Sequence, residues 1–288
     1  DFESFNKDFL SSPNNYNRTR ASSASVYKNL NQQYNAALNY NGTFATRHKF
    51  DVLLGSEFAD NYAFALSGSG SGAPTDDFMD LNLTNSDKDR RSINTDHSRQ
   101  RILSLISRAN LYLFDSRYVI TGTFRREGYS RMIDNRWGNY GGVSAGWNVH
   151  NEEFFKSLSL SNVINTLKLR GSYGSIGNIN GIGGYTLQGS YGQNRYNGSI
   201  GYVVGTPPNS GLRWESLITK EVGLDARLFN KIDLSVAYYH RTTSDKIATL
   251  VFPVSAGITG VSTNNGDMQN QGLEIDLGYN IYKNKDWN

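Results

Sequence analysis

The four histidines are the first side chains to consider for metal binding or acid–base chemistry. They are far apart in the chain, at His48, His97, His150 and His240, and the 288 residues contain no cysteine. A zinc site needs several nitrogen, sulfur or carboxylate ligands that converge on one ion, usually from motifs with short spacing. The histidines are therefore interpreted as loop and turn residues, and we predict no metal site, no catalytic residue and no cofactor.

Two further segments do not match a nucleotide or nucleic-acid site. The run GSGSG at residues 68–72 lacks the Lys-Ser or Lys-Thr pair and the helix that follow a phosphate-binding loop. The run DKDRR at residues 87–91 is typical of a solvated loop. Because the net charge is only +3, the composition does not indicate a nucleic-acid partner.

Five carboxylates recur at spacings that suggest either acid–base catalysis or one polar face of a sheet. They are Glu221, Asp225, Asp233, Glu274 and Asp276. Residues two or four apart in a strand lie on the same side of the sheet. We interpret all five as residues that face the lumen of a barrel, where they bind water, neighbouring Arg and Lys, or a plug.

The segment from residue 212 to 247 reads as two amphipathic strands joined by a tight turn at Phe229-Asn230-Lys231. Apolar residues occupy every second position on both sides of that turn, as a strand with one apolar face requires. The strands exceed the usual five or six residues, whereas a strand that crosses a membrane needs about ten. We therefore expect a lipid-facing set opposite the carboxylates: Val222, Leu224, Ile232, Leu234, Val236, Leu273, Ile275 and Leu277.

The composition agrees with strands of this kind. Only 38% of the residues are hydrophobic and the mean hydropathy is −0.53, yet the chain has 18 Tyr, 14 Phe and 4 Trp. A membrane barrel places hydrophobic residues at alternate positions and gathers aromatic side chains at both interfaces, so its average hydropathy is low. No run of 18 apolar residues is present, which excludes a spanning helix from the sequence pattern.

The rest of the pattern predicts hairpins separated by loops. We expect a polar surface loop over the first 30 residues, a hairpin over 30–54 that turns between Asn41 and His48, and a long loop over 65–99. A hairpin over 101–126 turns at Phe114–Arg117 and precedes an irregular segment over 127–139. A strand over 143–149, one or two helical turns within 151–159, and a strand over 167–174 follow. Loops are expected over 176–211 and 252–266, before a last strand over 273–281. The whole predicts an all-β, antiparallel transmembrane β-barrel segment of about nine strands with short periplasmic turns and long external loops.

Aromatic residues fall into two groups. Those near the expected strand ends fit an interfacial girdle: Tyr34, Tyr40, Tyr118, Tyr238, Tyr239 and Tyr279. Others lie in or beside loops, where flat rings can stack on sugars while polar groups bond the hydroxyls. We predict that seven residues of loop regions contact a ligand or a partner protein: Tyr185, Tyr191, Arg195, Tyr196, Trp214, Trp137 and Tyr140.

Five short segments carry a family resemblance. They are FRREGYSR at 124–131, NRWGNYGGVSAGWNV at 135–149, SYGSIGN at 172–178, LRWESLITKEVGLD at 212–225 and NQGLEIDL at 270–277. In this order they resemble strand landmarks of SusC/RagA-type TonB-dependent outer-membrane transporters, over nearly the whole chain from about Tyr34. The pattern departs at Glu127 and Tyr129, where that family has an acidic-glycine-serine pattern beginning with Asp. The long loops match nothing in the family pattern, which leaves the substrate open.

The resemblance implies a place in the bacterial outer membrane, in contact with lipid, and a barrel of about 22 strands with a plugged lumen. Residues 1–288 are then part of a single barrel domain, with the plug and the TonB-contacting segment outside them. A sheet of nine strands alone would leave two unpaired edges in lipid, so we expect the chain to need further strands.

The resemblance also implies a transporter and not an enzyme. Its activity would be TonB-dependent import of a nutrient, a glycan oligosaccharide or a peptide, together with a SusD-like surface lipoprotein and the TonB complex. The residues by themselves leave one alternative, an all-β surface carbohydrate-binding or adhesin module. In that case the apolar face would pack against a second sheet.

Overall fold

The structure is a computed structural model that describes residues 2–6, 9–12, 15–17, 19–77, 80–87, 90–158, 163–258 and 260–279. The chain divides into two compact units. Unit 1 comprises Asp1–Gln33 and Ala59–Arg101, and unit 2 comprises Tyr34–Phe58 and Ile102–Asn288. Among the described residues, no helix is long and apolar enough to cross a membrane.

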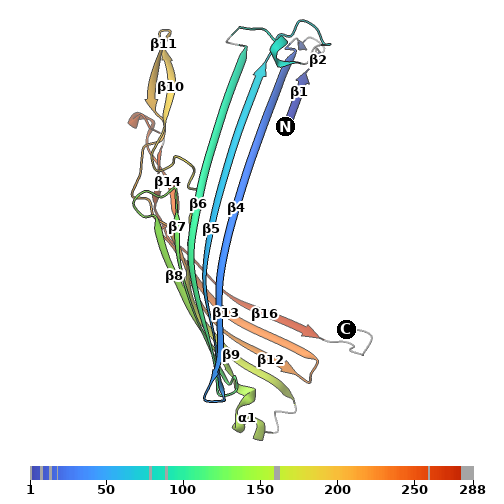
Figure 1. The fold of residues 1–288 in the computed structure, drawn as a ribbon, viewed down its shortest axis with the longest axis vertical. Coiled ribbons are helices and arrows are strands. Elements are labelled where there is room, and N and C mark those ends of the chain that lie inside the picture. The colour runs from blue at the N-terminus through green and yellow to red at the C-terminus, as the bar shows by residue number, and fades with distance from the viewer. Residues whose placement is uncertain are drawn as a thin grey trace. The chain divides into compact units, whose positions relative to one another are not determined.

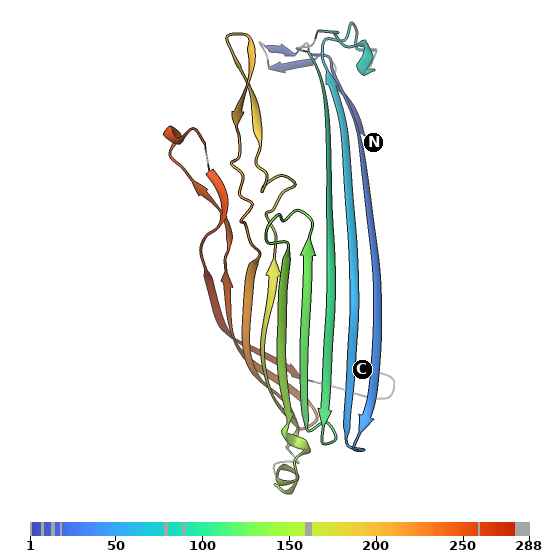
Figure 2. The same cartoon turned by 60° about the vertical axis from the view of Figure 1, so that its left-hand side comes forward.

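The nine strands that have residues in unit 2's main sheet are antiparallel neighbours, which confirms the predicted fold class and the prediction of about nine strands. The strands follow the order β4-β5-β6-β7-β8-β9-β12-β13-β16 (Figures 1 and 2). Their bounds are Ala21–Phe44, His48–Gly70, Arg91–Leu113, Tyr118–Tyr129, Trp137–Asn148, Ile164–Asn178, Glu215–Leu228, Ile232–Ser244 and Met268–Tyr279. Since sequential neighbours pair throughout, each strand needs only a turn or a loop to reach its partner.

Three strands, β4, β5 and β6, run through both units. Unit 1 adds β1 (Phe2–Asn6), which pairs with β4, the small hairpin of β2 (Phe9–Ser12) and β3 (Asn15–Asn17), and the 3-10 turn η1 (Leu81–Leu83). Within this unit Arg99 and Arg101 both bind the buried carboxylate of Asp60, at 2.6 and 3.1 Å. An ion pair of this kind holds adjacent polar strands in register.

The described part of the first 30 residues is mostly strand, so the prediction of a surface loop is wrong there. The segment 21–33 is mostly polar, and its few large apolar residues do not recur at every second position, so no alternation marks it as a strand, yet neighbouring strands supply its hydrogen bonds. For the same reason the loop predicted over 65–99 is shorter, because β5 continues to Gly70 and β6 begins at Arg91.

Other boundaries differ in a similar way. The first hairpin turns at Ala45–Arg47, and Asn41-Gly42 lies inside β4, where a Cβ on Gly42 would lie 2.7 Å from the Phe50 ring. The segment 127–139 is mostly strand, since β7 extends to Tyr129 and β8 begins at Trp137. Ile281, the predicted end of the last strand, lies outside the described residues.

The two loops predicted over 176–211 and 252–266 contain their own hairpins. The first carries β10 (Tyr191–Tyr196) and β11 (Ser199–Val204), joined by Asn197-Gly198 with φ of 48° and 81°. The second contains η4 (Val254–Ala256) and β15 (Gly260–Asn264), which pairs with β14 (Ile247–Val251). Both hairpins lie at the end of unit 2 opposite α1 (Figure 2).

The other end of unit 2 has the predicted tight turns at Phe114–Arg117 and Phe229–Lys231. It also has the helical segment predicted within 151–159, as the helix α1 (Glu153–Ser157), and a 3-10 turn η2 (Val149–Asn151) that begins at the last residue of the strand predicted over 143–149. Adjacent turns are bonded to each other: the Asp115 amide donates to the carbonyl of Arg47 at 2.9 Å, and their side chains form an ion pair at 2.8 Å. The turns therefore form one connected rim.

A chain of aromatic rings follows this rim. The His48 ring lies 5.1 Å from Phe44 and 4.8 Å from Phe114, with distances measured between ring centroids. Tyr118 continues the chain at 6.1 Å from Phe114, and Trp147 stacks on Tyr118 at 6.3 Å. Rings gathered at one end of a membrane barrel are the mark of an interface between lipid and water.

Glu152 lies between η2 and α1, and it holds the last two rings of this row, Tyr118 and Trp147, in place. Its carboxylate accepts hydrogen bonds from Trp147 Nε1 and the Tyr118 hydroxyl, both at 3.0 Å, and from Arg117 Nη1 at 3.3 Å. The Trp147 bond, together with those from Tyr118 and Arg117, lowers the pKa of the Glu152 carboxyl below its ordinary value of 4.5, against an opposing effect of desolvation.

The lowered pKa predicts how acid acts on this end of the sheet. The folded protein holds the ionised form more tightly than the unfolded chain does, so this stabilisation is complete above pH 4.5 and is lost as the pH falls through the lower, folded-state pKa. We expect Glu152→Gln to lower the thermal unfolding temperature of the full-length protein in detergent at neutral pH. The unfolding temperature of this variant should also fall less than that of the wild type when the pH is lowered.

The neighbouring Glu153→Gln is the matched control, because the Glu153 side chain is 90% exposed and lies 3.7 Å from Arg117. Melting curves recorded by tryptophan fluorescence from neutral to acid pH would make the comparison. Identical curves for the two variants would refute a role for the Glu152 bonds.

Candidate functional site

The sheet of unit 2 has one polar face and one apolar face, and the predicted residue sets lie on opposite sides. Register places Asp225 opposite Ser235 and Ser235 opposite Asp276, whereas Leu224 lies opposite Val236 and Val236 opposite Ile275. Paired residues in a sheet share a face. The polar face is defined here as the one that carries Glu221 and Asp225, and the apolar face as the one that carries Val222 and Leu224.

Arginines neutralise most carboxylates of the polar face. Arg170 forms ion pairs with Glu221 and, at 3.2 Å, with Asp225, which also accepts a bond from Ser235 Oγ at 2.7 Å. Arg227 binds Asp233 through two nitrogens, at 2.6 and 3.0 Å. Carboxylates paired with arginines in this way bridge adjacent strands, an arrangement that suits a wall in contact with water better than proton transfer.

The same arrangement recurs farther along the sheet. Arg125 binds Glu127 at 2.6 Å and lies 3.9 Å from Glu57, so it connects β7 with β5. By contrast Glu274 and Asp276 are exposed on β16, whose other edge has no paired strand among the described residues. The polar face is thus crossed by charge pairs on neighbouring strands, a pattern that supports the interpretation of the five carboxylates without assigning them a chemical reaction.

The apolar face is not covered by a second sheet in the part of the chain that the structure describes. Val222 is 60% exposed, and Leu273, Ile275 and Leu277 are 63–68% exposed. Leu224, Ile232, Leu234 and Val236 are half-buried by their neighbours on the same face. A surface of contiguous large apolar side chains fits lipid. The described residues thus do not show the second sheet against which a sandwich would pack this face.

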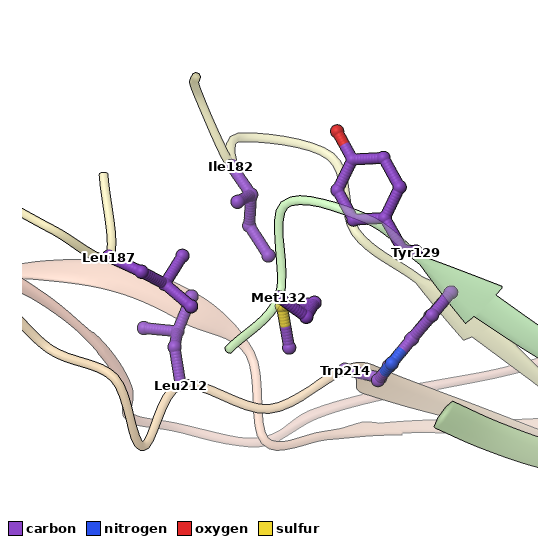
Figure 3. Close-up of a cluster of buried hydrophobic side chains, with 6 residues drawn as sticks. All are labelled: Tyr129, Met132, Ile182, Leu187, Leu212 and Trp214. Atoms are coloured by element: carbon purple, nitrogen blue, oxygen red, sulfur yellow. The ribbon is translucent and has the colours of Figure 1, made fainter. Parts of the chain in front are cut away.

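A separate hydrophobic core lies among the loops. It consists of Tyr129, Met132, Ile182, Leu187, Leu212 and Trp214 (Figure 3). These residues come from the end of β7 and from three loop segments, the last of which ends just before β12, so the cluster joins loops that are distant in sequence. Met132 and Leu212 have no exposed surface, which indicates a tightly packed and ordered loop base.

Hydrogen bonds fix this loop core to the sheet. Trp214 Nε1 donates to the backbone carbonyl of Asn135 at 3.1 Å, and the side-chain Nδ2 of Asn135 donates to the carbonyl of Gly211 at 3.1 Å. Buried Glu215 accepts from Asn178 Nδ2 at 2.6 Å and from the Ile247 amide at 2.7 Å. The carboxylate of Glu215, at the start of β12, therefore connects the end of β9 with the start of β14.

The predicted contact residues separate into buried and exposed groups. Trp214 is only 8% exposed, and the half-buried Tyr140 packs beside it with ring centroids 5.9 Å apart. Trp137 is 41% exposed and lies 5.0 Å from the guanidinium of Arg126, which sits over its ring. These three rings pack on their neighbours, and a contact with a ligand stays a prediction for them.

The other four residues are exposed, and three of them share one hairpin. Tyr191 and Tyr196 are 76% and 87% exposed on β10, with Arg195 between them, and Tyr185 is 61% exposed in the preceding loop. Sequence reasoning missed Tyr202, which is 69% exposed on β11 opposite Gln193. The Asn197-Gly198 pair between alternating residues could have revealed this hairpin, because such a pair favours a two-residue turn with positive φ.

Comparison with known proteins gives the family. The family model for "TonB dependent receptor-like, beta-barrel" matches residues 2–288. The TonB-dependent receptor P39 of Formosa agariphila is 30% identical over 250 residues, which are 86% of this chain and 24% of that protein. The TonB-dependent receptor SusC of Bacteroides thetaiotaomicron is 29% identical over 270 residues, 89% of this chain and 26% of that protein.

Solved structures agree with the sequence matches. A structure of the RagAB peptide transporter superimposes with a TM-score of 0.87 and 25% identity, over 99% of this chain and 31% of that one. A structure of the RagAB peptide importer in its "closed-closed" state gives a TM-score of 0.83 and 27% identity, over 95% and 30% of the two chains.

The chain spans about a quarter of the length of the curated relatives that it matches. The family model and the structural match to the RagAB peptide transporter both extend over nearly all of this chain. The chain therefore belongs to the TonB-dependent receptor-like β-barrel family, with SusC and RagAB among its similar proteins, and its strands are part of a bacterial outer-membrane barrel.

Proposed function

We propose that the full-length protein imports a nutrient across the outer membrane by TonB-dependent transport and that this chain forms part of its barrel wall and external loops. The observation that carries the proposal is the exposed aromatic hairpin β10–β11, held above the sheet by an ordered loop core. The family match supports transport, because the relatives are named TonB-dependent receptors. The described part of the chain has no group of His, Cys, Asp or Glu that could hold a metal ion, and the proposal invokes none.

The cargo and partners belong to the same proposal. A glycan oligosaccharide or a peptide fits exposed tyrosine rings beside an arginine, since rings stack on apolar surfaces and a guanidinium bonds hydroxyls or carboxylates. The similarity to the RagAB peptide importer supports the peptide class, and the exposed rings support the glycan class. We further propose that a SusD-like lipoprotein docks on the loops and that the TonB complex acts through segments outside residues 1–288.

The two faces of the sheet have distinct roles in this proposal. The apolar face meets lipid, while Glu221, Asp225, Asp233, Glu274 and Asp276 face the lumen. The reverse arrangement would place charged side chains in lipid. On the lipid face of a barrel, at the bilayer centre, Arg or Lys destabilises the fold by about 2–4 kcal/mol, and Asp or Glu by less.

Adjacent residues on β16 test this facing. Ile275 lies on the apolar face and Asp276 on the polar face, and residues 1–288 contain no native cysteine. We expect a fluorophore on Ile275→Cys of the full-length protein to be quenched by brominated lipid chains, whereas one on Asp276→Cys is quenched by iodide in water. The opposite pattern would contradict the facing.

The hairpin tyrosines test the cargo or partner surface. We expect Tyr191→Ala combined with Tyr196→Ala to weaken cargo uptake or lipoprotein docking, each ring contributing about 0.5–1.5 kcal/mol, or roughly two- to tenfold. Tyr27→Ala is a control with similar exposure, 62%, on β4. Uptake assays, lipoprotein pull-down and outer-membrane amounts would be compared. Unchanged uptake and docking in the double variant would show that the hairpin only covers the loops beneath it.

The buried tryptophan gives a different expected result. Trp214→Ala should loosen the loop core, because truncating a buried Trp typically costs about 3–5 kcal/mol, and should speed proteolysis of the loops around 179–211. Trp214→Phe retains most of the ring packing and should restore protease resistance. If Trp214→Ala reduces uptake while loop proteolysis stays at the wild-type rate, Trp214 acts by direct contact with cargo.

A further inference from the structure

A cationic and hydrogen-bonding row borders the apolar face toward its loop end. Register aligns Tyr173 with Lys220, Lys220 with His240, and His240 with Gln271, across β9, β12, β13 and β16. The next row toward the tight turns is Gly171, Val222, Tyr238 and Leu273, and the rows after it are wholly apolar. The face thus changes within one row from apolar to polar and cationic.

The cation of this row has no carboxylate partner. None of the residues that share the apolar face on β7, β8, β9, β12, β13 and β16 is Asp or Glu, as their registers show. The nearest acidic residue in sequence, Glu221, points to the other face, where it pairs with Arg170. Lys220 is exposed, and the described residues give it no ion-pair partner. The row therefore attracts an anion from outside the chain.

The same row borders a groove. A depression of about 600 Å³ is lined by Tyr173, Lys220, Val222, Tyr238 and His240, among others. Gly171 leaves the adjoining surface open, because a Cβ built there would meet only the carbonyl oxygen of Glu221, at 3.8 Å. The groove thus has a polar end at Lys220 and an apolar side along Val222.

Hydrogen bonds orient the side chains at the polar end. The Tyr238 hydroxyl donates to Gln271 Oε1 at 3.1 Å, and the His240 ring is hydrogen-bonded to the Gln269 amide. Tyr173 and Tyr238 are 48% and 45% exposed; Tyr173 is the register partner of Lys220, and Tyr238 lies in the next row toward the tight turns. The Lys220 ammonium, the Tyr173 hydroxyl and the His240 ring nitrogen that faces away from Gln269 can donate to a phosphate group, while the Tyr238 ring lines its side.

The depth of the row agrees with a membrane interface. Lys220 lies eight residues from Leu228, and His240 lies eight residues from Ile232, where the tight turn begins. At about 3.4 Å per residue and a tilt of about 40°, eight residues rise roughly 20 Å, close to the ~25 Å height of the apolar band of such barrels. The exposed Phe229 and Tyr279 mark the opposite border.

We propose that Lys220, His240, Tyr173 and Tyr238 form a binding site for the phosphate of an anionic membrane lipid, with one acyl chain lying along Gly171, Val222 and Leu224. A lipid is favoured over a protein partner because the rows next to the site on the side of the tight turns are apolar and uncovered in the part of the chain that the structure describes. This inference rests on the facing proposed above, in which the apolar face meets lipid, and it is independent of the cargo.

Lipid retention by the full-length transporter tests the site. The protein would be reconstituted in nanodiscs of phosphatidylglycerol mixed with phosphatidylcholine, transferred to detergent, and examined by native mass spectrometry. We expect the wild type to retain phosphatidylglycerol, and Lys220→Ala combined with His240→Ala to retain at least threefold less. Lys168→Ala removes a lysine from the polar face and should leave retention unchanged.

Two further measurements show whether retention depends on the acyl chain or on the phosphate charge alone. Gly171→Leu fills the apolar side while every charge stays in place, and should also reduce retention. Excess inorganic phosphate should not displace the lipid, since the acyl chain contributes to binding. Retention at the wild-type level in the double variant, with its barrel still folded by heat-modified gel mobility, would overturn the proposal, as would displacement by phosphate alone.

The facing itself is checked by the Ile275→Cys fluorophore. Quenching of that label by lipid together with unaltered lipid retention in the double variant would refute the lipid site alone. Absence of quenching would refute the facing and the lipid site together.

Discussion

Backbone hydrogen bonding between neighbouring strands is the constraint on which the rest of this structure depends. A strand surrounded by hydrocarbon has no water to bond its N–H and C=O groups, so each group needs a partner on the next strand. Unbroken antiparallel pairing from β4 to β16 meets that need and forces side chains to alternate between two faces. Charged residues can then occupy one face, where arginines such as Arg170 and Arg125 bridge strands, while the other face stays apolar.

The pairing is interrupted where the sheet gives way to loops. Paired residues of β8 and β9 end at Gly142 and Gly174, and the Tyr140 ring lies beyond that point. A Cβ on Gly138 or Gly177 would come within 2.1 Å of Tyr140 atoms, so both positions require glycine for the ring to fit. The ring contacts Trp214, and the loop core begins there. Buried hydrophobic clustering, the usual stabilising feature of soluble proteins, is thus found at the loop end of unit 2.

The two ends of unit 2 are stabilised by different interactions. At the tight turns, aromatic rings from separate hairpins contact one another in sequence, and Glu152 collects donors from β7, β8 and the turn before β7. At the loop end, a buried carboxylate, Glu215, and an apolar cluster hold the loop bases together. The ordered loop core keeps the strand ends in place, so the hairpin β10–β11 can expose its rings while the strands below it stay fixed.

The sequence by itself determined the faces, the strand number and two of the tight turns. Alternation with a period of two is a local property, so Val222, Leu224 and Leu234 could be assigned to one face and Glu221 and Asp225 to the other before any partner strand was known. Phe114–Arg117 and Phe229–Lys231 were equally clear, because apolar alternation stops and resumes around them. The family resemblance extended these local patterns to a barrel.

Only the tertiary structure decided which residues meet across the sheet and which are buried. Residues 21–33 are mostly polar without apolar alternation, and they become a strand because neighbours bond their backbone. Trp214 and Tyr191 looked alike as loop aromatics, yet one is 8% and the other 76% exposed, since burial depends on segments that come from far away in the chain. Lys220 and His240 likewise share a row because register joins β12 to β13, whereas the sequence shows them only as residues on either side of a turn.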